Sequence, residues 1–173
     1  MKRVWTLLAA LLPLTFSNVW ADGGSGAVAG VESRGNAGGL GVQLVLTADE
    51  NAFRQAWSQP TPPKLRVTQT VRQGGEVAAL LIFGGCVANA AGVCDLVSEF
   101  VLEGPDGNKV PASGGAVWQH APVAPGKAQL GTVSIKMSFD QTDPVGDYRL
   151  WAEVKDKVSG NVVSVRTGLK VTQ

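Results

Sequence analysis

Two cysteines and a single histidine are the residues whose types could support redox or metal chemistry in this sequence. Cys86 and Cys94 are separated by seven residues, whereas thiol redox centres commonly use the spacing Cys-x-x-Cys. A zinc site would need His120 together with these cysteines or with scattered carboxylates. In an oxidising compartment the spacing favours a structural disulfide between Cys86 and Cys94, with unpaired thiols and a metal or redox site as the alternatives.

The sequence gives little support for hydrolytic chemistry. His120 is the only histidine available to a Ser-His-Asp arrangement, and no serine stands in a Gly-x-Ser-x-Gly turn. Carboxylates are numerous, but nothing in their spacing singles out a pair for glycoside hydrolysis. We therefore expect a non-enzymatic protein without cofactor or metal and read His120 as a surface residue, with an enzyme based on a carboxylate pair as the alternative.

Three tryptophans are the candidates for a binding surface, because tryptophan is enriched at interface hot spots. Trp57 belongs to an expected helix, and Trp118 lies with His120 in an irregular stretch at 110–127. Trp151 interrupts the polar positions of an expected strand. Each of them could instead be a packed residue, since tryptophan buries a large area. Trp151 is then either covered by the helix that carries Trp57 or exposed as a contact for sugar rings or protein.

Residues 1–21 have the pattern of a cleaved secretory signal. Lys2 and Arg3 precede an apolar run at 4–14, and the segment ends on Val-Trp-Ala. The run is shorter than the ~20 residues of a bilayer-spanning helix, which predicts no stable membrane insertion after cleavage. The glycine-rich residues 22–41 are predicted to form a flexible leader. The expected location is the periplasm or the extracellular space.

The charge balance excludes one class of partner. The chain has 15 basic and 14 acidic residues, and removal of Lys2 and Arg3 with the signal leaves 13 basic residues against 14 acidic ones. Binding to nucleic acid or to an anionic membrane needs a basic surplus on one surface. We therefore expect no nucleic-acid partner.

The remaining residues, 42–173, are predicted to form one all-β domain of about seven strands with one short helix. A capping box from Thr47 to Glu50 predicts the start of the helix. Residues 110–127 are expected to be a long loop with at most one short strand. Alternating or continuous apolar residues predict the strands, which are expected at 41–46, 65–72, 77–83, 96–103, 133–139, 148–154 and 162–171. The strands at 65–72 and 77–83 are expected to pair as a hairpin, because only a short turn at 73–75 separates them.

A turn followed by a tyrosine late in the chain indicates the kind of sandwich. Asp143 and Pro144 begin the turn, Gly146 permits a positive φ, and Tyr148 takes the first inward position of the next strand. This stretch resembles the tyrosine corner of bacterial immunoglobulin-like β-sandwich domains, although Leu150 stands where antibody domains have a cysteine. The resemblance implies an immunoglobulin-like sandwich in which Tyr148 is buried and its hydroxyl is bound to nearby backbone.

Taken together, these features favour a non-catalytic periplasmic or secreted interaction module, an accessory or binding subunit of a cell-envelope assembly, with an envelope protein or glycan as partner. The alternative is a carbohydrate-binding module that stacks Trp118 and Trp151 on sugar rings. Both hypotheses expect a binding surface formed by the Trp57 helix, the stretch at 110–127 and the polar face that carries Trp151.

Overall fold

The computed structural model describes residues 33–60 and 64–173. The predicted signal peptide and residues 22–32 of the predicted leader lie outside this range. The described residues form nine strands and one helix: β1 (Arg34–Ala37), β2 (Leu40–Thr47), α1 (Glu50–Trp57), β3 (Thr70–Arg72), β4 (Gly75–Gly84), β5 (Leu96–Glu103), β6 (Lys109–Trp118), β7 (Gln129–Phe139), β8 (Gly146–Asp156) and β9 (Val162–Thr172). The predicted all-β class is confirmed, with nine strands in place of about seven.

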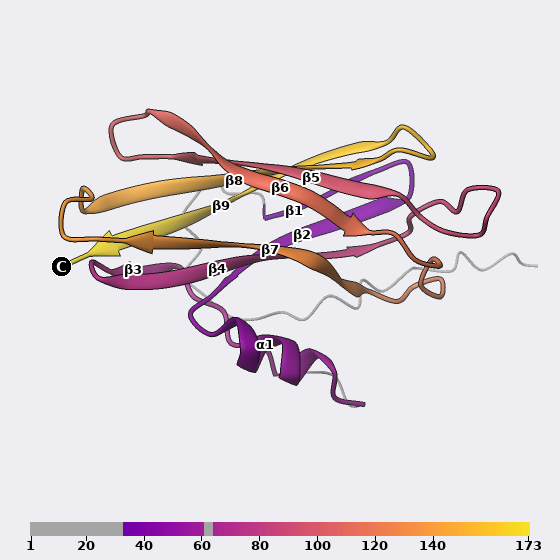
Figure 1. Cartoon of the computed structure of the whole chain (residues 1–173), viewed down its shortest axis with the longest axis horizontal. Helices are drawn as coiled ribbons and strands as arrows, with labels where there is room; N and C mark the ends of the chain where they lie inside the picture. Colours follow the sequence, from indigo (N-terminus) through magenta and orange to yellow (C-terminus); the bar gives the residue numbers. More distant parts are fainter. Residues whose placement is uncertain (1–32, 61–63) are drawn as a thin grey trace, which may run out of the picture.

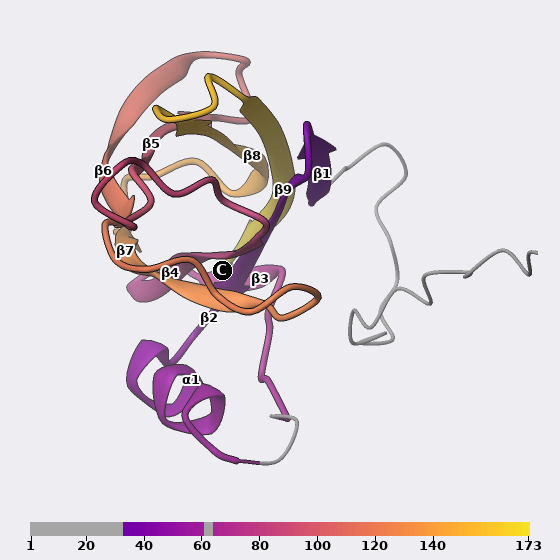
Figure 2. The same ribbon diagram turned by 90° about the vertical axis from the view of Figure 1, so that its right-hand side faces the viewer.

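The strands form two sheets that pack face to face as an immunoglobulin-like sandwich (Figures 1 and 2). One sheet has the order β1-β2-β4-β7 and the other β3-β9-β8-β5-β6. Neighbouring strands are antiparallel except β3 and β9, which pair in parallel. Helix α1 lies on the outer side of the four-stranded sheet. No helix of the described chain is long and apolar enough to cross a membrane.

The main core lies between the sheets and follows from the alternation of apolar residues. In β8, for example, Leu150, Ala152 and Val154 are buried while Arg149 and Glu153 are exposed. Central strand β4 has no such alternation, because its second face is also covered. Its residues Leu80 and Ile82 belong to a second apolar cluster beneath the helix.

The N-cap of the helix lies two residues later than the capping box predicts. Asp49 is the N-cap, and its carboxylate accepts a hydrogen bond from the amide of Ala52. Thr47 instead accepts from the amide of Asp49 at 3.2 Å, which leads the chain out of β2. Glu50 does not reach back to the cap, because its carboxylate accepts from Arg54 at 2.8 Å and from Ser134 of β7 at 2.7 Å. Asp49 therefore caps the helix, and Glu50 bonds to Arg54 in the same helix and to Ser134 of β7.

The predicted hairpin formed by residues 65–72 and 77–83 is wrong. Only Thr70–Arg72 is a strand, and it pairs with β9 in the five-stranded sheet, whereas β4 belongs to the four-stranded sheet. The turn at Gly74 therefore carries the chain from one sheet to the other. Alternation marks which face of a strand is buried, but it does not identify the neighbouring strand.

The long loop predicted at 110–127 is also wrong over its first half, because Lys109–Trp118 is the edge strand β6. An edge strand tolerates Pro111 and glycines, since one of its sides has no ladder to complete. The pairing with β5 shifts register twice. At Gly114 an added Cβ would overlap the backbone oxygen of Ser98, so this close approach requires glycine. The irregular composition reflects an edge position.

The sandwich begins before residue 42. Residues 34–47, which include the end of the predicted leader, form the hairpin β1–β2. Its turn consists of Gly38 and Gly39 with φ of +55° and +93°, the left-handed values that a tight hairpin turn requires. Gly35 lies against Val163 of β9 with no room for a side chain. Glycine here serves a tight turn and close packing.

The tyrosine corner is present as the resemblance implies. Tyr148 is 6% exposed, and its hydroxyl donates a hydrogen bond to the carbonyl of Pro144 at 2.8 Å. The ring meets Phe139 edge-on with centroids 5.2 Å apart. Gly146 has φ of +145°, and an added Cβ would lie 3.0 Å from the ring of Pro105.

Replacing Tyr148 by Phe is expected to lower the free energy of unfolding by about 1 to 1.5 kcal/mol, because one buried hydrogen bond is lost. Gly146→Val is expected to cost more, since it adds backbone strain and contact with Pro105. Urea denaturation of both variants measures these losses. Unchanged midpoints would show that the corner does not contribute to stability.

Candidate functional site

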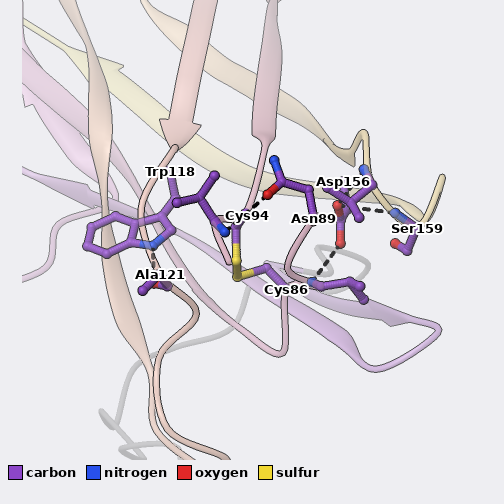
Figure 3. The surroundings of a disulfide bond; sticks show 10 residues. Cys86, Asn89, Cys94, Trp118, Ala121, Asp156 and Ser159 are labelled. Atoms are coloured by element: carbon purple, nitrogen blue, oxygen red, sulfur yellow. Dashed lines mark hydrogen bonds between the residues drawn. A yellow bond between two sulfur atoms is a disulfide. The ribbon is translucent and has the colours of Figure 1, made fainter. Parts of the chain in front are cut away.

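The predicted disulfide between Cys86 and Cys94 is present. It closes a loop of mostly exposed small residues between β4 and β5 (Figure 3). Inside the loop, the side chain of Asn89 accepts hydrogen bonds from the amides of Ala91 and Val93. The loop is therefore held both covalently and by its own side chain.

A buried carboxylate that the sequence analysis did not select fastens this loop to the rest of the sandwich. Asp156 ends β8 and is 0% exposed. Its carboxylate accepts from the amides of Val87 at 3.0 Å, Val158 at 2.9 Å and Ser159 at 3.4 Å. Burial by itself raises the pKa of Asp156, but these hydrogen bonds outweigh it, so that the pKa lies below its ordinary value.

Trp118 and His120 lie at this same end of the molecule. The indole of Trp118 packs against Phe83 with centroids 5.7 Å apart and donates to the carbonyl of Ala121 at 3.0 Å. His120 is exposed and meets Trp118 edge-on at 4.9 Å. Its carbonyl accepts from the amide of Cys94. These contacts give Trp118 a packing role at the edge of the core.

Trp57 lies on the outer side of the four-stranded sheet. It is partly buried beside a cluster that contains Phe53 of α1 and residues of the sheet beneath, namely Val45, Leu80, Ile82 and Leu130. Trp151 belongs to the five-stranded sheet, so the helix that carries Trp57 does not cover it. The expected surface uniting Trp57, the stretch at 110–127 and Trp151 is therefore not brought together.

Trp151 is partly exposed and forms a cluster with charged residues from four strands. Its indole donates to Glu103 at 3.2 Å, and the cations of Lys109 and Arg166 lie 5.1 Å from its ring centroid. Arg149 pairs with Glu103 at 3.1 Å. The indole hydrogen bond, with help from Arg149 and Lys109, holds the pKa of Glu103 below its ordinary value. We call these five residues the Trp151 cluster.

The register of β5, β6, β8 and β9 places the Trp151 cluster on the face opposite to the buried Leu150 and Ala152, the outer face of the five-stranded sheet. Helix α1 lies against the other sheet and leaves this face open (Figure 2). This face can bind by aromatic packing and by charge, because it offers an indole ring among three cations and one carboxylate. Among the described residues, no three His, Cys, Asp or Glu side chains form a group suited to a metal ion.

Of the residues that the sequence did not single out, Asp156 had a signal in the sequence. Asp156 continues the inward phase of Tyr148, Leu150, Ala152 and Val154, which places a carboxylate at a core position. That pattern could have marked it as buried and hydrogen-bonded. Lys109 was missed because β6 was expected to be a loop. Arg166 could not have been assigned to Trp151, since their contact depends on the register of β8 and β9.

The fold and the cluster define the class of protein, a β-sandwich with one open, charged and aromatic sheet face. No protein-family model matches the sequence, and no curated protein does. Among solved structures, the chain is similar to the sporulation control protein Spo0M of Bacillus subtilis, with 11% identity and a TM-score of 0.46. The match covers 79% of this chain and 51% of Spo0M, so the chain spans about half of that protein's length.

Two smaller proteins match over most of their own length. A Niemann-Pick type C2 protein from the Japanese carpenter ant has 8% identity and a TM-score of 0.40, with 83% of this chain and 96% of that protein covered. The CARDB domain of a Pyrococcus furiosus protein has 10% identity and a TM-score of 0.37, with 81% and 96% covered. Similarity at this level assigns neither a family nor a ligand.

Proposed function

We propose that this protein is a non-catalytic interaction module of the periplasm or extracellular space, an accessory or binding subunit of a cell-envelope assembly. Its contact surface is the outer face of the five-stranded sheet, centred on the Trp151 cluster. The observation that carries the proposal is a partly exposed tryptophan on a sheet face that α1 leaves open. The Cys86–Cys94 disulfide supports an oxidising location.

The second candidate function is a carbohydrate-binding module. Of the two tryptophans predicted to stack on sugar rings, only Trp151 supports this function, because the ring of Trp118 packs against Phe83 and His120. A screen of soluble glycans separates the two candidates. Sugar binding that depends on Trp151 would favour the carbohydrate module, whereas capture of an envelope protein without sugar binding would favour the assembly role.

The variant Trp151→Thr tests the contact surface, because threonine suits a strand and removes the ring. Its free energy of unfolding is expected to fall by only about 1 kcal/mol, as for a partly exposed residue, while capture of partners from envelope extract is lost. Val67→Thr is the matched control, since Val67 is 53% exposed beside the start of α1. Equal capture by wild type and Trp151→Thr would refute the assignment of this surface.

A further inference from the structure

The row of Trp151 across the outer face of the five-stranded sheet is apolar on three neighbouring strands. Trp151 of β8 is the register partner of Val101 on β5, and Val101 is the partner of Pro111 on β6. Pro111 is exposed, and the other two are partly exposed. Register partners point to the same side of a sheet, so these three side chains form a continuous apolar strip. A ligand that covers the apolar strip needs an apolar surface of its own.

A row with surplus positive charge borders the apolar strip on one side. Arg149 of β8, Glu103 of β5 and Lys109 of β6 are the register partners in this row. Glu103 pairs with Arg149 at 3.1 Å and with Lys109 at 3.6 Å, so one carboxylate serves two cations. Both cations remain accessible, with 59% of the Arg149 side chain and 57% of the Lys109 side chain exposed. This row can therefore bind one more negative charge.

The indole of Trp151 positions a cation of this row without neutralising it. The Nζ atom of Lys109 lies 5.1 Å from the centroid of the ring. A cation–π contact attracts the ammonium group through the quadrupole of the ring, but it leaves the charge of that group unchanged. Lys109 is thus held beside the apolar strip with its charge available to a ligand.

Two carboxylates border the apolar strip on its other side. Glu99 of β5 and Glu153 of β8 are direct register partners, and both are exposed. In the described part of the chain, neither carboxylate forms an ion pair. Carboxylates accept hydrogen bonds from hydroxyl groups, whereas they repel another negative charge. This side of the strip therefore suits an uncharged edge of a ligand that carries hydroxyl groups.

The three features together require a ligand with an apolar face, a negative charge on one edge and hydroxyl groups on the other. A uronic acid residue of a glycan has all three, because its sugar ring exposes C–H groups, a carboxylate and hydroxyls. Each charged row lies two residues along the strands from the apolar strip, or about 6.6 Å, so its long side chains can reach a ring that lies over Trp151. We propose that this face binds an acidic glycan through a uronate residue, with its carboxylate bound by Arg149 and Lys109.

An acidic peptide fits this face less well. Successive side chains of an extended chain point to opposite sides, so a run of acidic residues would also place carboxylates against Glu99 and Glu153. The inference rests on the proposed function, since it takes the same face as the contact surface and names the ligand class for the carbohydrate-binding candidate.

Calorimetric titration of the purified full chain tests the proposal. The probes are short oligomers of galacturonate, guluronate and mannuronate, and the neutral controls are the same oligomers with their carboxylates reduced to alcohols. At least one uronate oligomer is expected to bind at low ionic strength. Its reduced form is expected to bind at least about tenfold more weakly, because charged hydrogen bonds are lost. Binding of the uronate oligomer should also weaken as salt screens the charges.

Two variants locate the site. Trp151→Thr is expected to abolish binding, and Lys109→Gln/Arg149→Gln is expected to weaken uronate binding at least about tenfold. Lys136→Gln is the matched control and should bind like wild type, since Lys136 is 59% exposed and pairs with Glu76 on the four-stranded sheet. Urea denaturation of each variant shows that it is folded.

Absence of binding to every uronate oligomer would overturn the proposal, and so would binding that Trp151→Thr leaves intact or equal binding of the reduced oligomers. Tighter binding of poly-L-glutamate than of the uronate oligomers would identify an acidic peptide as the ligand instead. None of these results decides the capture experiment with envelope extract. An envelope protein captured through Trp151 without any uronate binding would refute the acidic glycan and leave the proposed function standing. Failure of both experiments would refute both.

Discussion

The variant Asp156→Ala is expected to lose about 3 to 5 kcal/mol of unfolding free energy near neutral pH. Three backbone amides, those of Val87, Val158 and Ser159, donate to this one buried carboxylate. Hydrogen bonds to charged groups contribute about 1.5 to 3 kcal/mol each, and a buried donor left without a partner adds a desolvation cost. The full sum is not reached, because the loop can relax and admit water. Chemical denaturation at pH 7 measures the loss.

Asp140→Ala is the matched control. Asp140 also caps a turn, accepting from the amide and hydroxyl of Thr142, but it is exposed at the β7–β8 turn. Its replacement is expected to cost much less, because water can satisfy the released groups. Equal losses in the two variants would show that burial is not the reason for the effect of Asp156.

The contribution of Asp156 should depend on pH in a defined direction. Its pKa is lowered in the folded protein, so its stabilising effect is complete above the unfolded-state pKa of about 3.9. The effect is lost as pH falls through the lower, folded-state pKa. The difference in unfolding free energy between wild type and Asp156→Ala should therefore narrow below about pH 4. A constant difference down to pH 2 would contradict the assignment.

The variant Phe53→Ala is expected to cost about 3 to 4 kcal/mol, the range for truncation of a buried phenylalanine. Phe53 is 1% exposed and is the buried residue of α1. A helix of eight residues is not stable alone in water. Its position therefore depends on this ring and on the hydrogen bonds that Glu50 and Arg54 form with β7. Loss of the ring should detach the helix as well as open a cavity.

Two measurements separate docking from simple cavity formation. Detachment of α1 should shift the fluorescence of Trp57 to longer wavelength in the native state, because its ring leaves the cluster beneath the helix. Phe53→Leu is the control, since it keeps an apolar side chain of similar volume and should cost less than about 1.5 kcal/mol. A native spectrum like that of wild type, with a loss below about 1 kcal/mol, would show that Phe53 does not dock the helix.

Local patterns in the sequence determined the element types and much of the core. Strand β5 occupies the predicted residues 96–103, because a period of two with apolar residues on one side is a property of consecutive residues. The tyrosine corner at Tyr148 could also be predicted from the sequence, since the turn and the tyrosine after it are close in the chain. The disulfide followed from spacing and redox compartment.

Strand partners were decided only by the tertiary structure. Residues 65–72 were expected to pair with 77–83, yet β3 pairs with β9 about a hundred residues later. The edge strand β6 looked like a loop, because proline and glycine are tolerated where one side of the ladder is open. The turn glycines of the β1–β2 hairpin similarly looked like a flexible leader.

The composition of the candidate site was also decided by the tertiary structure. The sequence by itself identified Trp151 as an aromatic residue among polar positions of a strand, which is a local fact. Its neighbours Lys109 and Arg166 come from β6 and β9, and its partner Glu103 comes from β5. Register arises from hydrogen bonding and packing between segments far apart in the chain, so only the folded sandwich shows which charged residues surround Trp151.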